Sequence, residues 1–258
     1  MKVYFITRFS IFDPAFGGFK ITKKKDPIEY KKELFDRERL DFKFEVFERV
    51  TFPSIISQTF DDWEWIIYTS DQLPLNYMYR LKDLIKNHSR IVIFTVKDFK
   101  EFFDRTETFN YKKPFATVRI DDDDALNKNF AEKLQVYANN WGNIISFTEG
   151  SLGKYRAGHL IMGQKISEKN NAQGLAAIGI NIYSCGRHSD IHLRYNVIYD
   201  NSPGMFILTC SPFTDTKRGF SPLERNMRRI EYLAKLAFSN PSEVPNAIVN
   251  FLKKNLQR

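Results

Sequence analysis

Cysteine is scarce in this sequence of 258 residues: only Cys185 and Cys210 occur, and neither belongs to a CxxC pair or to a zinc-ligand spacing. Two cysteines so far apart indicate small core residues in a reducing compartment and argue against a disulfide-stapled scaffold. Long apolar runs are missing too, because no stretch approaches the roughly 20 residues of a membrane-spanning helix, and the first residues contain no signal-peptide core. We therefore expect a cytoplasmic protein.

Several phosphate-binding and nucleic-acid-binding signatures are also absent. The chain has no P-loop, no GxGxxG glycine fingerprint, and no RNP or zinc-finger motif. It has no internal repeat, low-complexity tract or linker either. These absences argue against a P-loop enzyme and against the common nucleic-acid-binding modules, and they predict a single domain over residues 1–258.

Negative charge is in the minority. The formal net charge is +8 with a pI near 9.3, and 43% of the residues are hydrophobic, which is typical of a folded globular protein. The positive surplus favours an anionic partner such as a nucleotide diphosphate, nucleic acid or a membrane headgroup layer. An ordinary solvated, lysine-rich surface explains it equally well, so particular sites must decide.

Hydrophobic periodicity alternates between strand and helix along the first 150 residues. The patterns predict strands at 2–7, 63–69, 90–96, 115–120 and 143–147 and helices at 42–58, 75–87, 98–105 and 128–139. The strongly charged residues 20–39 predict an excursion or a surface helix. Alternation of this kind predicts an α/β fold with a mostly parallel, Rossmann-like sheet flanked by helices.

Glycines punctuate the chain after residue 150, which predicts flexible connections between further strands at 181–184 and 205–209. A capping-box pattern then predicts a helix over 221–238, and a basic helix follows over 241–256. The last helix either packs on the core or touches the anionic inner face of a membrane as a peripheral contact.

Four consecutive carboxylates, Asp121 to Asp124, follow the apolar strand predicted at 115–120. Like charges gathered in this way are normally compensated by a cation with oxygen ligands, so the run predicts a Mn²⁺ or Mg²⁺ site and not a zinc site. Alternate side chains share one face of a strand, so we expect Asp121 and Asp123 to point together while Asp122 points away. A solvated acidic turn or a helix N-cap is the alternative.

Other polar residues follow earlier predicted strands. Thr7 and Arg8 come at the end of the first strand, and Asp71 comes just after the second. The carboxyl ends of parallel strands meet at one edge of a sheet, where α/β proteins bind their ligands. These residues and the four aspartates therefore predict one binding site at that edge.

Taken together, these segments resemble a known family. The matching segments are Phe5 to Phe9 (FITRF), Phe52 to Ile55 (FPSI) with Gln58-Thr59, Trp63 to Ile66 (WEWI), and Arg119 to Leu126 (RIDDDDAL). Their order is similar to that of the rhamnosyltransferase family, GT-A glycosyltransferases related to the family-two enzymes, over about the first 150 residues. The resemblance implies one GT-A domain, with residues 1–127 on the nucleotide-sugar side and 128–258 on the acceptor side.

The same resemblance implies an activity. It implies divalent-metal-dependent transfer of a sugar, rhamnose being one candidate, from a nucleotide-diphosphate donor to a glycan or lipid-linked acceptor in surface polysaccharide synthesis. The implied nucleotide-sugar ligands are Thr7, Arg8, Asp71, Arg119, Asp121 and Asp122. The implied metal ligands are Asp121, Asp123, Asp124 and His188.

His188 enters this set because a histidine expected near 205–210 is missing and Cys210-Ser-Pro-Phe stands there instead. The turn that contains His188 resembles the family's glycine–histidine turn, although a surface or core histidine is the alternative. An inverting reaction also needs a base within reach of the acceptor hydroxyl. Glu149 is the first candidate, Asp190 and Asp215 are others, and each is equally explained as an exposed carboxylate.

Basic stretches at 154–156 and 217–219 are candidates for lid loops over the diphosphate, and solvated loops are the alternative. Three other functions fit part of the pattern: a metal-dependent nucleotidyltransferase, a nucleic-acid-binding protein, and a non-catalytic glycan-binding relative. We expect no nucleic-acid partner, because the basic residues are dispersed. The donor sugar and base, the acceptor, the linkage, the stereochemical outcome and the oligomeric state are not predicted.

Overall fold

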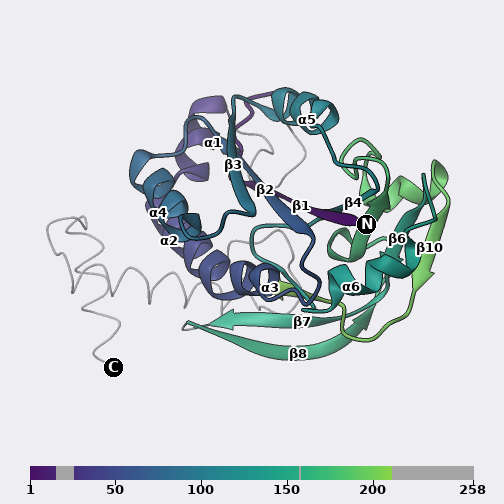
Figure 1. The fold of residues 1–258 in the computed structure, drawn as a ribbon. Helices are drawn as coiled ribbons and strands as arrows, with labels where there is room; N and C mark the ends of the chain where they lie inside the picture. The colour runs from purple at the N-terminus through teal and green to yellow at the C-terminus, as the bar shows by residue number, and fades with distance from the viewer. Residues whose placement is uncertain (16–25, 157, 211–258) are drawn as a thin grey trace, which may run out of the picture. The chain divides into compact units, whose positions relative to one another are not determined.

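A computed structural model of the protein describes residues 1–15, 26–156 and 158–210 (Figure 1). Met1–Thr209 form one compact unit, and Cys210–Arg258 are grouped separately from it. The helices predicted at 221–238 and 241–256 lie outside the described residues. Within the described ranges, no helix has the length and apolar character that crossing a membrane requires.

A seven-stranded sheet lies at the centre of Met1–Thr209, in the order β10-β6-β9-β4-β1-β2-β3. Its strands are β1 (Lys2–Phe9), β2 (Trp63–Ser70), β3 (Ile91–Val96), β4 (Phe115–Arg119), β6 (Ile144–Phe147), β9 (Leu175–Ile178) and β10 (Val197–Asp200). Neighbouring strands are parallel except around β9, which is antiparallel to both β4 and β6. The predicted mostly parallel α/β sheet is confirmed, and its first five strands fall within two residues of their predicted bounds.

The described helices are α1 (Pro27–Leu34), α2 (Arg37–Val46), α3 (Phe52–Ile56), α4 (Leu75–Ile85), α5 (Phe99–Thr108) and α6 (Phe130–Leu134), with a π-helix, η2 (Phe47–Thr51), joining α2 to α3. Acidic side chains cap the beginnings of three of them, α1, α2 and α5. The helix predicted at 42–58 starts earlier because the Asp36 side chain accepts a hydrogen bond from the Arg39 N–H at 3.1 Å. Pro53 has no backbone N–H to donate, but it does not end the helical segment. It lies in the first turn of α3, directly after the π-helix η2, where the missing N–H is tolerated.

Alternate residues of β1 pack against different layers, as the two-residue period of a strand requires. The Phe9 ring lies 4.8 Å from that of Phe44 in α2 and 5.3 Å from that of Phe47 in η2. Ile6 belongs instead to a buried cluster that contains Phe102 of α5. Figure 1 accordingly shows α2 and α3 lying together, with α5 apart from them.

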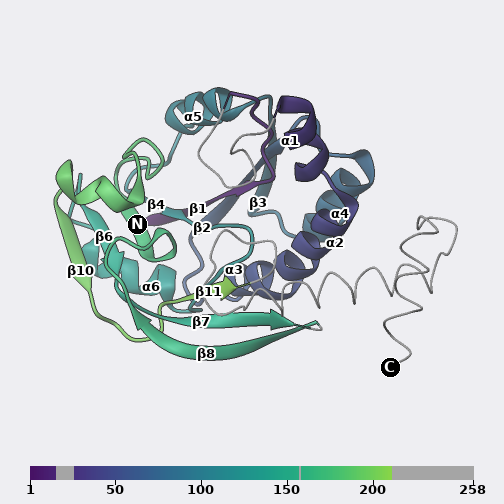
Figure 2. The ribbon, with the colours of Figure 1, turned by 180° about the vertical axis from the view of Figure 1, so that it is seen from behind.

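A second sheet has four strands in the order β5-β11-β7-β8. They are β5 (Ala125–Leu126), β7 (Glu149–Arg156), β8 (His159–Ser167) and β11 (Phe206–Cys210), and Figure 2 shows β11 beside β7. The prediction of flexible glycine loops after residue 150 is wrong here, because β7 and β8 form an antiparallel hairpin. The lid expected at 154–156 is therefore part of a paired strand, and the one expected at 217–219 lies outside the described residues.

The strand predicted at 205–209 is confirmed as β11, whereas the one predicted at 181–184 is a turn. This turn is tied to β4, because Thr117 Oγ1 accepts a hydrogen bond from the Ile182 N–H at 2.9 Å and donates one to the Ile180 carbonyl at 2.8 Å. The helix predicted at 128–139 is shorter and consists of α6 and a 3₁₀ turn, η3 (Gln135–Tyr137). Local patterning therefore located the early strands better than the later connections.

Candidate active site

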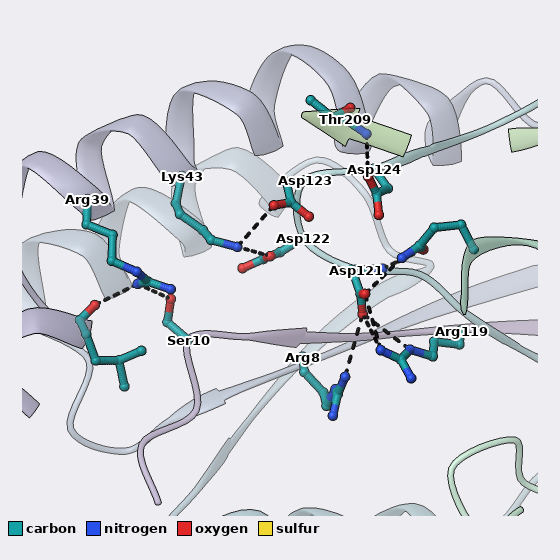
Figure 3. A network of polar contacts seen from close by, with 12 residues as sticks. Arg8, Ser10, Arg39, Lys43, Arg119, Asp121, Asp122, Asp123, Asp124 and Thr209 are labelled. Carbon is teal, nitrogen blue, oxygen red and sulfur yellow. Dashed lines mark hydrogen bonds and ion pairs between the residues drawn. The ribbon is translucent and has the colours of Figure 1, made fainter. Parts of the chain in front are cut away.

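The sheet changes direction between β1 and β4. The chain leaves β1 for β2 and β3 on one side and then crosses to β4 on the other side. Open α/β sheets bind ligands at such a switch point, outside the carboxyl ends of the strands. Arg8 lies near the end of β1 and the four aspartates directly follow β4, so the structure brings them together at this point (Figure 3).

Asp121 to Asp124 form a turn between β4 and β5 and do not extend the strand. The Asp124 N–H donates to the Asp121 carbonyl at 3.4 Å. The predicted common face of Asp121 and Asp123 is wrong, because side chains alternate only along an extended strand. Instead Asp121 faces two arginines, whereas Asp122 and Asp123 both face Lys43.

Asp121 is held on several sides. Arg119 Nη2 lies 3.2 Å from both of its carboxylate oxygens, and Arg8 Nη2 lies 3.7 Å from Oδ1. The Gln173 amide donates to Asp121 Oδ2 at 2.8 Å and accepts from the Asp121 backbone N–H at 3.1 Å. Burial alone would raise the pKa of Asp121, but the charges of Arg119 and Arg8 and the Gln173 hydrogen bond outweigh it and hold that pKa well below its usual range.

Tyr183 lies against both arginines. The guanidinium carbon of Arg8 is 5.1 Å from the ring centroid of Tyr183, and that of Arg119 is 5.7 Å from it. Cation–π contacts of this kind favour a guanidinium that lies over the ring. The phenol is buried and donates to the Ile6 carbonyl at 3.3 Å. The ring therefore keeps both guanidinium groups beside Asp121.

Lys43 reaches the aspartate turn from the middle of α2. Its Nζ donates a hydrogen bond to Asp122 Oδ1 and lies 3.5 Å from Asp123 Oδ2. Burial opposes protonation of this amine, but the charges of Asp122 and Asp123 outweigh burial and raise the pKa of Lys43. The ammonium therefore remains charged, and Figure 3 shows it approaching from the side opposite Arg8 and Arg119.

The last two aspartates are compensated least. Burial raises the pKa of Asp123 to about 6, with Lys43 counteracting the charges of Asp122 and Asp121. Burial also raises the pKa of Asp124 well above its usual range, although the Thr209 N–H of β11 donates to Asp124 Oδ1 at 2.6 Å. The Thr209 hydroxyl is buried, and no residue in the described part of the chain hydrogen-bonds it. Oxygen atoms that could bind a cation are thus gathered at Asp123 and Asp124.

The predicted metal ligands are only partly assembled. Among the described residues, no three His, Cys, Asp or Glu side chains converge in a group that could hold a metal by itself. His188 lies in the 3₁₀ helix η5 (His188–Leu193), and its Nδ1 is 2.9 Å from the Asn170 carbonyl. Asp123 and Asp124 are the residues that could hold a cation, and they need oxygen atoms from a bound ligand to complete its coordination.

Thr7 does not lie with Arg8, although both were predicted to contact the nucleotide. Thr7 is fully buried, and its hydroxyl accepts a hydrogen bond from Trp65 Nε1 at 2.9 Å. Neighbouring residues of a strand point to opposite faces, so Arg8 reaches the aspartate turn and Thr7 packs on the α2 side. Asp71, by contrast, lies exposed at the end of β2, at the predicted edge.

The candidate bases lie on other elements. Glu149 is half-buried at the start of β7, where Thr148 Oγ1 donates to its carboxylate at 3.3 Å. Asp190 is exposed in η5 and accepts from Ser189 Oγ at 2.8 Å. Neither carboxylate is hydrogen-bonded to the aspartate turn in the described part of the chain, and Asp215 lies outside it.

Sequence analysis missed four members of the site: Lys43, Gln173, Tyr183 and Thr209. One signal was present for Lys43, since Arg39 and Lys43 are four residues apart and lie on the same helix face. Arg39 indeed faces the same region, where its Nη1 lies 3.3 Å from Ser10 Oγ. The other three come from segments that only the tertiary fold brings to the turn, so no local pattern could have identified them.

The fold has a counterpart among solved structures. The crystal structure of S. aureus TarS 1-349 in complex with UDP-GlcNAc matches with a TM-score of 0.50 at 8% identity, covering 92% of this chain and 67% of that chain. A second structure of the same protein, in complex with UDP, matches with a TM-score of 0.48 at 7% identity, covering 92% and 72%. At this identity the first match shows the fold alone. No curated protein matches the sequence.

The protein thus combines a mostly parallel sheet, with the fold of TarS, and an aspartate turn at the switch point of that sheet. The sequence matches the family model described as "Putative rhamnosyl transferase" over residues 2–221, and the chain belongs to this family. The resemblance in the first 150 residues is thereby confirmed and extends further along the chain. Membership also decides among the predicted classes in favour of a glycosyltransferase.

Proposed function

We propose that the enzyme transfers a sugar from a nucleotide-diphosphate donor to a glycan or lipid-linked acceptor in surface polysaccharide synthesis. Rhamnose is the candidate sugar because the family description names it. The observation that carries the donor site is the convergence of Arg8, Arg119 and Lys43 on the aspartate turn at the switch point. UDP-GlcNAc, the ligand in the TarS crystal structure, belongs to this class of donor.

A divalent cation, Mn²⁺ or Mg²⁺, fits this site. Asp124 supplies a buried carboxylate and Asp123 a partly buried one, and Thr209, whose N–H donates to Asp124, has a hydroxyl that no described residue hydrogen-bonds. These ions are commonly bound by one or two carboxylates together with substrate phosphates, so the protein need not complete the coordination. When bound, the cation would neutralise the negative charge that develops on the leaving diphosphate.

The remaining residues bind and orient the donor. Arg119 and Arg8 hold Asp121 at the turn, and their guanidinium groups bring positive charge to the place where the diphosphate would lie. Asp71, exposed at the end of β2, would contact the base or the ribose. We assign the base that accepts the acceptor proton to Glu149, because it is half-buried whereas Asp190 is exposed to solvent.

A thermal-shift panel tests the donor site. UDP, GDP, CDP and dTDP are each added with and without Mn²⁺ to wild type and to Asp123→Asn. A ligand that binds the native state raises the melting temperature by mass action, so we expect one nucleotide to stabilise wild type when Mn²⁺ is present. The same addition should have little effect on Asp123→Asn.

Asp190→Asn is the matched control, because it removes one exposed carboxylate by the same substitution. It should respond like wild type. No stabilisation of wild type by any of the four nucleotides, with or without Mn²⁺, would overturn the proposed donor site. Stabilisation that does not depend on Mn²⁺ would retain the donor site and remove the cation from it.

A further inference from the structure

Lys43 occupies the position where a cation would approach the aspartate turn. Its Nζ is hydrogen-bonded to Asp122 and lies 3.5 Å from Asp123 Oδ2, and only 11% of its side chain is exposed. The Asp122 and Asp123 side chains are 7% and 14% exposed. A buried ammonium therefore contacts Asp123, one of the two carboxylates that the proposed function gives to the cation site.

An ammonium and a divalent cation conflict at this position. Mg²⁺ lies about 2.1 Å from its carboxylate oxygens, so a cation on Asp123 would come within a few ångströms of Nζ. Like charges at such a distance repel strongly where the surroundings are poorly solvated. Binding of the cation to Asp123 therefore requires the ammonium to move away.

The Lys43 side chain has several rotatable bonds. Its backbone is fixed within α2 (Arg37–Val46), but the flexible four-carbon stem carries a compact charge with three rotatable donors. Arg39, one turn earlier in α2, is committed elsewhere, because its Nη1 donates to the Leu34 carbonyl at 2.7 Å and lies 3.3 Å from Ser10 Oγ. The Lys43 stem therefore has the rotatable bonds that a movement of its ammonium needs, whereas the Arg39 guanidinium is held by other contacts.

We propose that Lys43 is an internal competitor for the divalent cation and that it yields its place when the donor diphosphate offers it another anion. The inference rests on the proposed function. Without nucleotide, the Lys43 ammonium competes with Mn²⁺ for Asp123 and lowers the affinity of this site for Mn²⁺. With nucleotide, the ammonium moves to a diphosphate oxygen and the cation takes its position on the carboxylate. Cation and nucleotide therefore bind cooperatively, and Lys43 becomes a positioning residue for the leaving group.

The test measures Mn²⁺ affinity by titration calorimetry, first with Mn²⁺ alone and then at saturating UDP, GDP, CDP or dTDP. Lys43→Met should bind Mn²⁺ alone about tenfold or more tightly than wild type. The nucleotide should then increase the Mn²⁺ affinity of the variant less than that of wild type. Lys43→Arg, which keeps the charge, should stay close to wild type for Mn²⁺ alone.

Two further variants keep the test decisive. Lys82→Met removes one exposed positive charge from α4 and should bind Mn²⁺ like wild type. Because Lys43→Met leaves Asp122 buried and unpaired, the double variant Lys43→Met/Asp122→Asn removes both charges of the pair and should also show the tighter Mn²⁺ binding.

Equal Mn²⁺ affinity in wild type and in both Lys43→Met variants, together with nucleotide-dependent Mn²⁺ binding by wild type, would overturn this inference and leave the proposed function standing. Absence of Mn²⁺ binding in every variant with every nucleotide would remove the cation from the proposed function, and this inference with it.

Discussion

Gln173 makes two hydrogen bonds to one residue, Asp121: its amide nitrogen donates to the carboxylate at 2.8 Å and its amide oxygen accepts from the backbone N–H at 3.1 Å. These two hydrogen bonds hold both the backbone and the side chain of Asp121, the first aspartate of the turn. Gln173 lies in the 3₁₀ helix η4 (Ala172–Gly174), where the Asn171 side chain accepts from its backbone N–H at 3.1 Å. The later half of the chain therefore orients the turn that follows β4.

Gln173→Leu tests this role. The substitution leaves the partly buried backbone N–H of Asp121 without the Gln173 oxygen and removes one of the hydrogen bonds to the Asp121 carboxylate, which costs about 1–3 kcal/mol of folding free energy. We expect chemical denaturation to show a loss of this size and the thermal-shift panel to show weaker nucleotide binding. Gln164→Leu, at an exposed position in β8, is the control and should change neither quantity. Unchanged stability in Gln173→Leu would contradict the assigned role.

Asp123→Asn should stabilise the metal-free protein at neutral pH. The folded-state pKa of Asp123 is raised from 3.8 to about 6, so the stability that its protonated form contributes is present below pH 3.8 and is lost as the pH rises through 6. Asparagine resembles the protonated acid at every pH. Melting temperatures in EDTA should therefore exceed those of wild type by several degrees at pH 7.5 and by much less at pH 4.5.

Asp190→Asn provides the reference for this comparison, because its exposed carboxylate should give little difference at either pH. A gain for Asp123→Asn that is equal at both pH values would show that ionisation is not its cause. A loss at pH 7.5 would show that the contact with Lys43 outweighs the cost of burying the charge.

The early strands were predictable because each is a short β-rich run whose bounds are marked by polar residues. The hairpin of β7 and β8 was not, since its glycines suggested flexibility. Gly150 instead serves close packing, because a Cβ there would lie 2.4 Å from the Phe206 ring, and one at Gly153 would lie 2.7 Å from the Leu160 side chain. A glycine needed for packing and a glycine in a loop look the same in sequence.

The acidic run was recognised, but its compensation was not. Repulsion among four carboxylates predicts a compensating metal ion, and the structure adds Arg8, Arg119 and Lys43, which supply three positive charges at contact distance. These residues are far apart in sequence, and only the switch point between β1 and β4 and the packing of α2 bring them together. Which cation compensates which carboxylate is a property of the tertiary fold.

Glu149→Gln tests the proposed base. A positioned base typically contributes about 10²–10⁴-fold to the rate, so we expect kcat to fall by that order while nucleotide affinity in the thermal-shift panel stays unchanged. Asp190→Asn should keep a kcat near that of wild type, because its carboxylate is exposed. If Asp190→Asn shows the large loss and Glu149→Gln does not, the base lies in η5 and the assignment to Glu149 is wrong.

Thr7 and Arg8 give the sharpest contrast, because they are neighbours on β1 that point to opposite faces. Thr7→Val keeps the shape but removes the acceptor of the buried Trp65 indole N–H, so it should cost about 1–3 kcal/mol of folding free energy and leave nucleotide affinity intact. Arg8→Met removes a charge beside Asp121 and should weaken nucleotide binding about tenfold or more.

Chemical denaturation and nucleotide titration of both variants separate these outcomes. For each variant, the loss of folding free energy is compared with the loss of nucleotide affinity. Thr7→Val should mainly lower stability, and Arg8→Met should mainly lower nucleotide affinity. If Thr7→Val weakened nucleotide binding at unchanged stability, Thr7 would line the nucleotide pocket, as the family resemblance implied. In that case the alternation of side chains along β1 would not determine which residues contact the nucleotide. The fact that Thr7 and Arg8 point to opposite faces would then have no consequence for donor binding.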